Sequence, residues 1–152
     1  MISSEPYLSI PHRPPFIWVT RLMKRNENGS AGEVEYDLTP DVDVLRGHFP
    51  GDPIFPGVLQ IEAAAQACCW IYLGVLPPGT KPADVRFVSV DKYKFKRPVA
   101  PPCTLTIRGQ EISRRGTLYY WGVEVLMNGE VVSEGSFWLK LVNPPVLPEN
   151  QA

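Results

Sequence analysis

The sequence predicts an α+β fold in which one long helix is wrapped by an antiparallel sheet of about six strands. Three observations lead to this expectation. One segment, 58–73, is long, apolar and free of proline, whereas the segments after residue 84 are rich in β-forming residues and separated by turn signals. The seventeen prolines fall mostly in clusters between these segments, where neither a helix interior nor a central strand can accept them.

Each element follows from local pattern. Segment 58–73 is apolar nearly all round, so we expect a helix that is buried on most sides. Segments 16–23 and 32–38, with a turn at 26–31, predict the first two strands. The pairs Arg115-Gly116 and Asn128-Gly129 predict the last two hairpin turns. The remaining strands are expected at 85–97, 105–112, 118–126 and 131–142.

Length and composition restrict the class of protein. A chain of 152 residues predicts one domain, 1–142, followed by a flexible tail, 143–152. The net charge of -1 argues against nucleic acid as a partner, and no segment predicts a signal peptide or a membrane span. Three cysteines without a CxxC pair predict buried, reduced thiols and a cytoplasmic location. The two histidines and scattered carboxylates have no metal-ligand spacing, so no metal site is expected.

One segment combines a candidate base with a candidate acid. His48 stands in a Gly/Pro-rich loop, and Glu62 follows fourteen residues later on the apolar helix. A neutral imidazole suits general-base catalysis, and a protonated carboxyl in an apolar setting suits general-acid catalysis. Taken singly, each residue has a plainer interpretation: a structural or exposed loop histidine, and a glutamate that faces solvent. His12, in Pro11-His12-Arg13, is interpreted as structural.

Three further residues complete the candidate site. Gln66 lies one helical turn after Glu62, where the two side chains can form a hydrogen bond that orients the carboxyl group. The backbone N–H groups of Gly57 and Val58 are expected at the helix N-terminus, where they can stabilise an oxygen that gains negative charge. The alternative for Gly57 is a role in capping the helix.

These residues occur in an order that resembles the 3-hydroxyacyl-[acyl carrier protein] dehydratases. The resemblance rests on His48-Phe49-Pro50-Gly51, on Pro56-Gly57-Val58-Leu59 and on Glu62-Ala63 with Gln66; it extends to segments 11–16 and 89–99. It implies a hot-dog fold and a homodimer in which His48 of one chain faces Glu62 of the other. It also implies an acyl tunnel at the dimer interface, and it leaves open a trimer of dimers.

The resemblance further implies a reaction. The substrate would be a (3R)-3-hydroxyacyl thioester on the phosphopantetheine of acyl carrier protein, with no other cofactor, in fatty-acid or related specialised (polyene or polyketide-like) biosynthesis. His48 would remove the C2 proton, and Glu62 would protonate the departing hydroxyl to leave a trans-2-enoyl thioester. Two alternatives stay open: an acyl thioesterase on the same fold, and a non-catalytic subunit that binds acyl carriers.

Basic residues in two segments are candidates for docking an acidic carrier protein. Strand periodicity places Lys92, Lys94 and Lys96 on one face and the aromatic residues between them on the other. Arg97 follows directly, and Arg114 and Arg115 form a second group. The alternative for each is an ordinary solvated charge.

Overall fold

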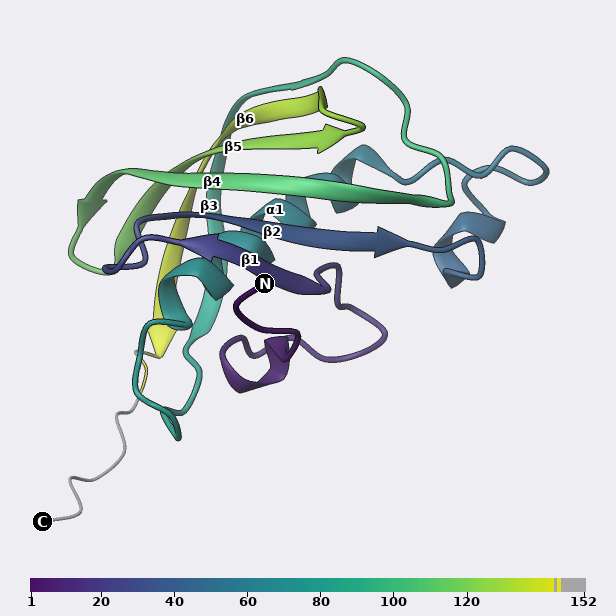
Figure 1. Cartoon of the computed structure of the whole chain (residues 1–152). Coiled ribbons are helices and arrows are strands. Elements are labelled where there is room, and N and C mark those ends of the chain that lie inside the picture. Colours follow the sequence, from purple (N-terminus) through teal and green to yellow (C-terminus); the bar gives the residue numbers. More distant parts are fainter. Residues whose placement is uncertain (144, 146–152) are drawn as a thin grey trace, which may run out of the picture.

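The computed structural model describes residues 1–143 and 145 and contains one long helix against one face of a six-stranded antiparallel sheet (Figure 1). The α+β prediction is therefore confirmed. The helix is α1 (Gly57–Leu73), and two short 3-10 helices, η1 (Pro6–Leu8) and η2 (Asp43–Arg46), lie outside the sheet. The strands are β1 (Arg21–Arg25), β2 (Ala31–Leu38), β3 (Asp84–Phe95), β4 (Cys103–Arg115), β5 (Leu118–Met127) and β6 (Glu130–Asn143), in the spatial order β1-β2-β4-β5-β6-β3.

Both predicted hairpin turns are present. Asn128 and Gly129 have φ values of 53° and 78° between β5 and β6, and the pairing of Met127 with Glu130 closes the turn. A two-residue turn with two positive φ angles matches the right-handed twist of the strands it joins, and Asn-Gly accepts this conformation readily. Arg115 pairs with Leu118 at the preceding turn between β4 and β5.

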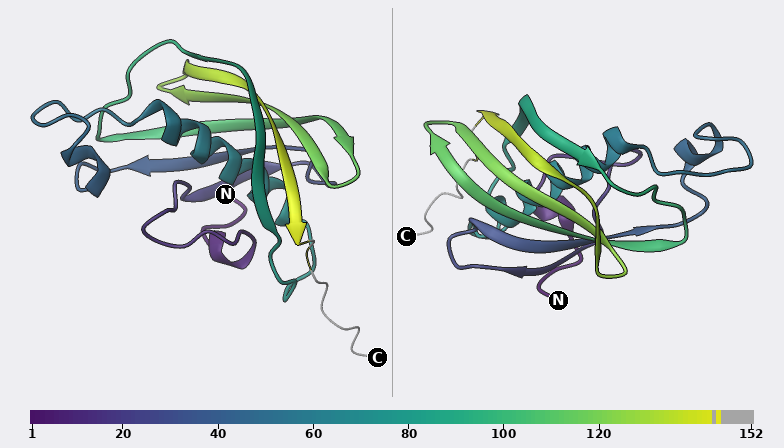
Figure 2. Two further views of the ribbon diagram at one scale, coloured as in Figure 1. Left: turned by 180° about the vertical axis from the view of Figure 1, so that it is seen from behind. Right: turned by 90° about the horizontal axis from the view of Figure 1, so that it is seen from above.

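The helix lies very close to the sheet because glycine stands where the two cross. A Cβ at Gly109 would be 2.9 Å from Cys68 Sγ, and one at Gly32 would be 2.9 Å from Ile71 Cγ1. Both positions accept only a hydrogen in place of a side chain. The sheet can therefore curl around α1, as both views of Figure 2 show, and the helix is buried from Ala63 to Ile71.

The first strand begins later than the pattern of residues 16–23 predicts. The regular pairing of β1 with β2 starts at Arg21, and Thr20 adds one backbone hydrogen bond to Glu35 of β2. The backbone groups of Phe16 and Trp18 bond to a helix side chain instead. The Gln66 amide accepts the Trp18 N–H at 2.8 Å and donates to the Phe16 carbonyl at 3.3 Å. Residues 16–18 are thus tied to the helix, and the hydrogen bonds to β2 begin at Thr20.

The lysine-bearing strand also departs from ideal alternation. The register of β3 against β6 shifts between Asp91 and Lys94, and Lys92 has a φ of 49°, so a bulge interrupts the expected period. Lys92 and Lys94 still line one hollow. The rings of Tyr93 and Phe95 pack against each other, with 5.1 Å between their centroids. Lys96 and Arg97 lie beyond the end of the strand.

The C-terminal end of the sheet reaches one residue further than expected. Asn143, assigned from the sequence to a flexible tail, is the last residue of β6 and pairs with Asp84 of β3. Of the remaining tail, only Pro145 is among the described residues. Within residues 1–143 and at 145, no helix has the length and apolar character required to cross a membrane.

Thiol alkylation tests the packing between α1 and the sheet. Cys68 and Cys69 are buried, and this burial raises the pKa of both thiols, that of Cys69 to about 12. Since the thiolate is the reactive form, iodoacetamide is expected to modify the half-buried Cys103 first in the native protein and the other two only after unfolding in urea. Peptide mass spectrometry measures all three rates, and equal rates in the native protein would contradict this packing.

Candidate active site

His48 lies in the loop that joins η2 to α1, and two hydrogen bonds shape that loop. The His48 Nδ1 atom is 2.8 Å from the Ile54 carbonyl oxygen, and the Ile54 N–H donates to the His48 carbonyl at 2.7 Å. Because a carbonyl oxygen only accepts, Nδ1 must carry the hydrogen. In the neutral ring the Nε2 atom therefore keeps its lone pair, as a general base requires. The Phe49 ring stacks on the imidazole at 4.2 Å between centroids.

Glu62 lies on the second turn of α1, and the hydrogen bond expected with Gln66 is present. The Gln66 Nε2 donates to Glu62 Oε1 at 3.0 Å. Gln66 is fully buried, whereas the Glu62 side chain keeps 16% of its accessible surface. The Glu62 carboxyl group is thus held by the buried Gln66 amide and remains partly accessible to solvent.

The orientation of the Gln66 amide follows from its other two partners. The Trp18 N–H can only donate and is bonded to Oε1, whereas the Phe16 carbonyl can only accept and is bonded to Nε2. Exchanging the amide oxygen and nitrogen would break both bonds. The amide must therefore present an N–H to Glu62, and this contact depends on a segment almost fifty residues away in the sequence.

His12 belongs to this site, although its sequence context indicated only a structural role. Its Nε2 atom is 3.3 Å from Glu62 Oε1, and its side chain is 19% exposed. The contact joins the segment before β1 to the helix. The one signal in the sequence was that the family resemblance extended to segment 11–16, which contains His12.

The backbone N–H groups of Gly57 and Val58 are at the N-terminus of α1, one turn before Glu62. Leu59 and Gln60 both donate to the Pro56 carbonyl, whereas no described residue accepts a backbone hydrogen bond from the N–H groups of Gly57 and Val58. A Cβ at Gly57 would be 2.7 Å from the Phe95 ring. A larger residue at Gly57 would therefore require the half-exposed Phe95 ring to move.

The structure does not bring all expected residues together in one chain. Glu62, Gln66 and His12 are in contact, whereas no hydrogen bond or ion pair among the described residues joins His48 to Glu62. The loop that carries His48 stands out beyond the end of the sheet (Figures 1 and 2). Within residues 1–143 and at 145, no three His, Cys, Asp or Glu side chains form a group that could hold a metal ion.

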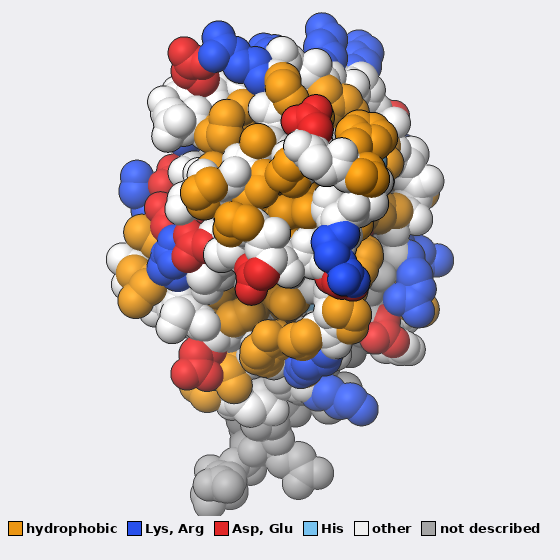
Figure 3. Space-filling model, turned by 90° about the vertical axis from the view of Figure 1, so that its right-hand side faces the viewer, with side chains coloured by type: hydrophobic (Ala, Val, Ile, Leu, Met, Phe, Trp, Pro, Cys, Tyr) orange, Lys and Arg blue, Asp and Glu red, His pale blue; other side chains and the backbone are white. Residues whose placement is uncertain are grey.

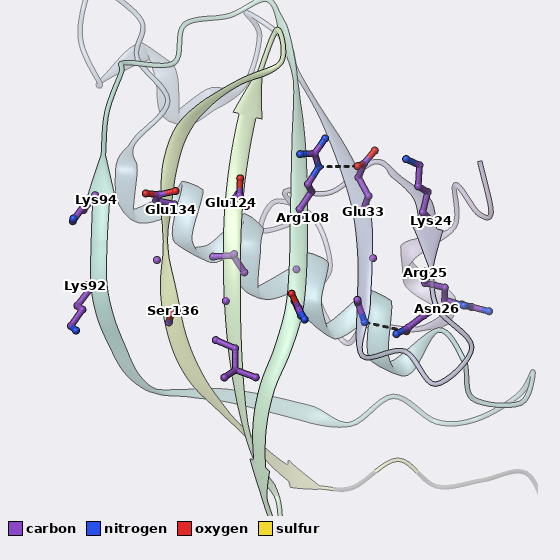
Figure 4. A pocket seen from close by; sticks show the side chains of 18 residues that line it. Lys24, Arg25, Asn26, Glu33, Lys92, Lys94, Arg108, Glu124, Glu134 and Ser136 are labelled. Carbon is purple, nitrogen blue, oxygen red and sulfur yellow. Dashed lines mark hydrogen bonds and ion pairs between the residues drawn. The ribbon is translucent and has the colours of Figure 1, made fainter.

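The candidate docking residues have different surroundings. Lys96 pairs with Glu134, Arg97 with Glu130 and Arg114 with Glu111, whereas Arg115 is an exposed residue at the β4–β5 turn. Lys92 and Lys94 line a hollow of about 700 Å³ on the sheet face opposite α1 (Figure 4). Lys24, Arg25 and Arg108 line the same hollow, together with Glu33, Glu124 and Glu134.

Comparison with solved structures confirms the hot-dog fold. A chain of the dehydratase heterocomplex ApeI:P from Xenorhabdus doucetiae superposes with a TM-score of 0.72 over 91% of both chains, at 16% identity. A hypothetical thioesterase from Streptococcus pneumoniae superposes with a TM-score of 0.60 over 81% of this chain and 85% of its own, at 11% identity. At these identities the likeness concerns the fold alone.

Sequence comparison is more specific. A 3-hydroxyacyl-[acyl-carrier-protein] dehydratase FabZ from Rhodopseudomonas palustris is 35% identical over 126 residues, or 83% of each chain. The protein of that name from Erythrobacter litoralis is 32% identical over 137 residues, or 90% of each chain. The family model of the FabA-like domain matches residues 10–136. The chain therefore belongs to the FabA-like family.

Proposed function

We propose that the protein is a 3-hydroxyacyl-[acyl carrier protein] dehydratase that converts a (3R)-3-hydroxyacyl thioester to a trans-2-enoyl thioester and water. The observation that carries this proposal is the hydrogen bond from His48 Nδ1 to the Ile54 carbonyl, since it leaves Nε2 as a base. The relatives named as dehydratases support the same reaction.

In this mechanism the chain supplies a base, an acid and two backbone donors. His48 Nε2 removes the proton from C2 of the acyl group, and the N–H groups of Gly57 and Val58 stabilise the enolate-like oxygen of the thioester. A donor of this kind contributes about 3 kcal/mol to transition-state stability in comparable sites. Glu62 then donates its proton to the hydroxyl group on C3, which leaves as water. Gln66 holds the Glu62 carboxyl in place, and no cofactor besides the carrier's phosphopantetheine takes part.

The site becomes complete in a homodimer. β3 is an edge strand, and its Val88 and Val90 side chains are 55% and 43% exposed. An exposed apolar edge strand is a ready partner for a second strand, so two copies of β3 are proposed to pair about a two-fold axis. Such a dimer would place the His48 loop of one copy near Glu62 of the other. A trimer of dimers would need further contacts.

Apolar surface near the His48 loop is consistent with this assembly. Figure 3 shows hydrophobic side chains spread across the face from which that loop projects. Val44, Phe49 and Val58, which lie just before, within and just after the loop, are 37%, 52% and 73% exposed. Exposed apolar residues that gather in one area mark interaction surfaces. In the proposed dimer they would cover the acyl chain and exclude water from the reacting atoms.

The decisive experiment offers the protein a panel of carrier-bound acyl chains and follows their mass. A 3-hydroxyacyl chain is expected to lose one water while staying on the carrier, and a saturated chain of equal length is expected to stay unchanged. Release of both chains as free acids would identify a thioesterase instead. Binding without any mass change would identify a non-catalytic subunit. The acyl lengths that react, and whether rings or conjugated bonds are accepted, would separate fatty-acid synthesis from a specialised pathway.

Carrier docking is proposed at Lys92 and Lys94, because both line the hollow and neither is in a described ion pair. Replacing both by glutamate is expected to raise KM for the carrier-bound substrate at least about tenfold, since surface charges steer association with an acidic partner. Turnover of a small thioester analogue should stay unchanged. The matched control is the Lys81→Glu, Lys140→Glu double variant, whose exposed lysines lie outside the hollow. Equal KM values in both double variants would exclude docking here.

A further inference from the structure

Two nitrogen atoms lie close to the same oxygen of the candidate acid. Glu62 Oε1 is 3.0 Å from Gln66 Nε2 and 3.3 Å from His12 Nε2. No hydrogen bond to Oε2 is formed by the described residues. The amide of Gln66 can only donate at this position, so Oε1 must be an acceptor. A second N–H donor to Oε1 would occupy its remaining lone pair, and a proton carried by Glu62 would then reside on Oε2, which has no partner among the described residues.

The burial of His12 indicates which nitrogen carries its hydrogen. Its Nδ1 atom is buried and has no hydrogen-bond partner among the described residues. A neutral ring with the hydrogen on Nε2 leaves only a bare lone pair at Nδ1, whereas a protonated ring would leave a charged N–H unpaired there. A buried group without a partner is destabilising, and more so when it is charged. The geometry therefore favours the neutral ring with its hydrogen on Nε2, the nitrogen that lies 3.3 Å from Glu62 Oε1.

We propose that His12 is a positioning residue for Glu62. In this role His12 donates its Nε2–H to Glu62 Oε1 and so directs the transferable proton to Oε2. This inference rests on the proposed dehydration. When Glu62 gives its proton to the leaving hydroxyl, it becomes a carboxylate, and a donor already in place stabilises that charge without reorganisation. His12 and Gln66 hold the oxygen that does not react, from two different elements of the fold.

Cys69 and Arg13 are ionisable residues next to this pair in the part of the chain that the structure describes. Burial, and in addition the nearby Glu62 charge, raise the pKa of Cys69 to about 12, so its thiol stays neutral through the assay range. The Arg13 guanidinium donates to the carbonyl oxygens of Ile10, His12 and Tyr7. In the proposed dimer, His48 of the second copy also approaches. A change in the alkaline limb of activity on altering His12 would therefore report on Glu62.

A matched pair of substitutions separates the donor from the packing. In His12→Gln the amide nitrogen reaches the position of Nε2, whereas in His12→Asn it reaches only that of Nδ1. His12→Asn is expected to lower kcat by about 10- to 100-fold, the effect of a lost hydrogen bond to a charged group, with KM nearly unchanged. Its alkaline limb should move up by about one pH unit, since the ionised acid loses a donor. His12→Gln should keep most of the kcat of the unmodified protein, and its alkaline limb should lie near that of the unmodified protein.

Equal kcat values and equal alkaline limbs in the two variants would overturn the proposal, because only packing would then have changed. A measurement on the unmodified protein decides the case in which His12→Asn fails to fold. Nitrogen-15 NMR of the histidine rings at neutral pH should show His12 with hydrogen on Nε2 alone. Hydrogen on Nδ1, or on both nitrogens, would also overturn it. The NMR measurement of this tautomer does not depend on enzyme activity. If the protein shows the expected tautomer but no dehydratase activity, the proposed function is refuted and the contact between His12 and Glu62 is not.

Discussion

Replacing His48 by alanine, or Glu62 by glutamine, is expected to reduce dehydration of a carrier-bound 3-hydroxyacyl chain by about 10²- to 10⁴-fold. His48→Ala removes the base. Glu62→Gln keeps the size of the side chain and its contact with Gln66, but an amide cannot supply the proton. The loss should appear in kcat rather than in KM, because neither change removes contacts to the acyl chain or the carrier. Steady-state kinetics with mass detection of the enoyl product measures both constants.

Two controls make this result specific. Glu27→Gln removes an exposed carboxylate on the β1–β2 turn and should leave kcat unchanged. Circular dichroism and thermal unfolding should show that both inactive variants keep the native fold, since His48 is in a loop and the Glu62 side chain is partly open to solvent. Full activity in a folded Glu62→Gln protein would exclude Glu62 as the acid. Full activity in folded His48→Ala would likewise exclude His48 as the base.

Mixing the two inactive variants is expected to restore activity. If His48 of one chain acts with Glu62 of the other, a mixed dimer contains one site with both native residues and one site with neither. Random re-association gives mixed dimers in about half of the molecules, so roughly a quarter of all sites should become active. Subunits are dissociated in mild denaturant and refolded together, and the recovered kcat is compared with that of native protein treated in the same way.

The double variant, His48→Ala with Glu62→Gln, is the control for this experiment. A chain that carries both changes spoils both sites of any dimer that it forms with a native chain. An excess of it should therefore reduce the activity of the native protein during re-association, the opposite of the rescue. If the single variants stay inactive when mixed although size measurements show mixed dimers, each site must be built from one chain.

Features of this protein that depend on neighbouring residues followed from the sequence alone. The helix 58–73, the Asn128-Gly129 turn and the contact of Gln66 with Glu62 all involve residues at most a few positions apart. Their geometry is set by the helical period and by the φ angles that each residue accepts. The order of the motifs around His48 and Glu62 likewise sufficed to indicate the family, which the relatives bear out.

Only the tertiary structure decided the contacts between distant segments. Gln66 takes up the backbone groups of Phe16 and Trp18, so these residues do not join the sheet despite their β-forming character. His12 reaches Glu62 because the same segment lies along α1, and no spacing in the sequence encodes a contact fifty residues apart. Local preference describes what each segment can form. Which buried polar group bonds to which partner is settled when the segments pack together, since a buried polar group without a hydrogen bond is destabilising and most such groups find one.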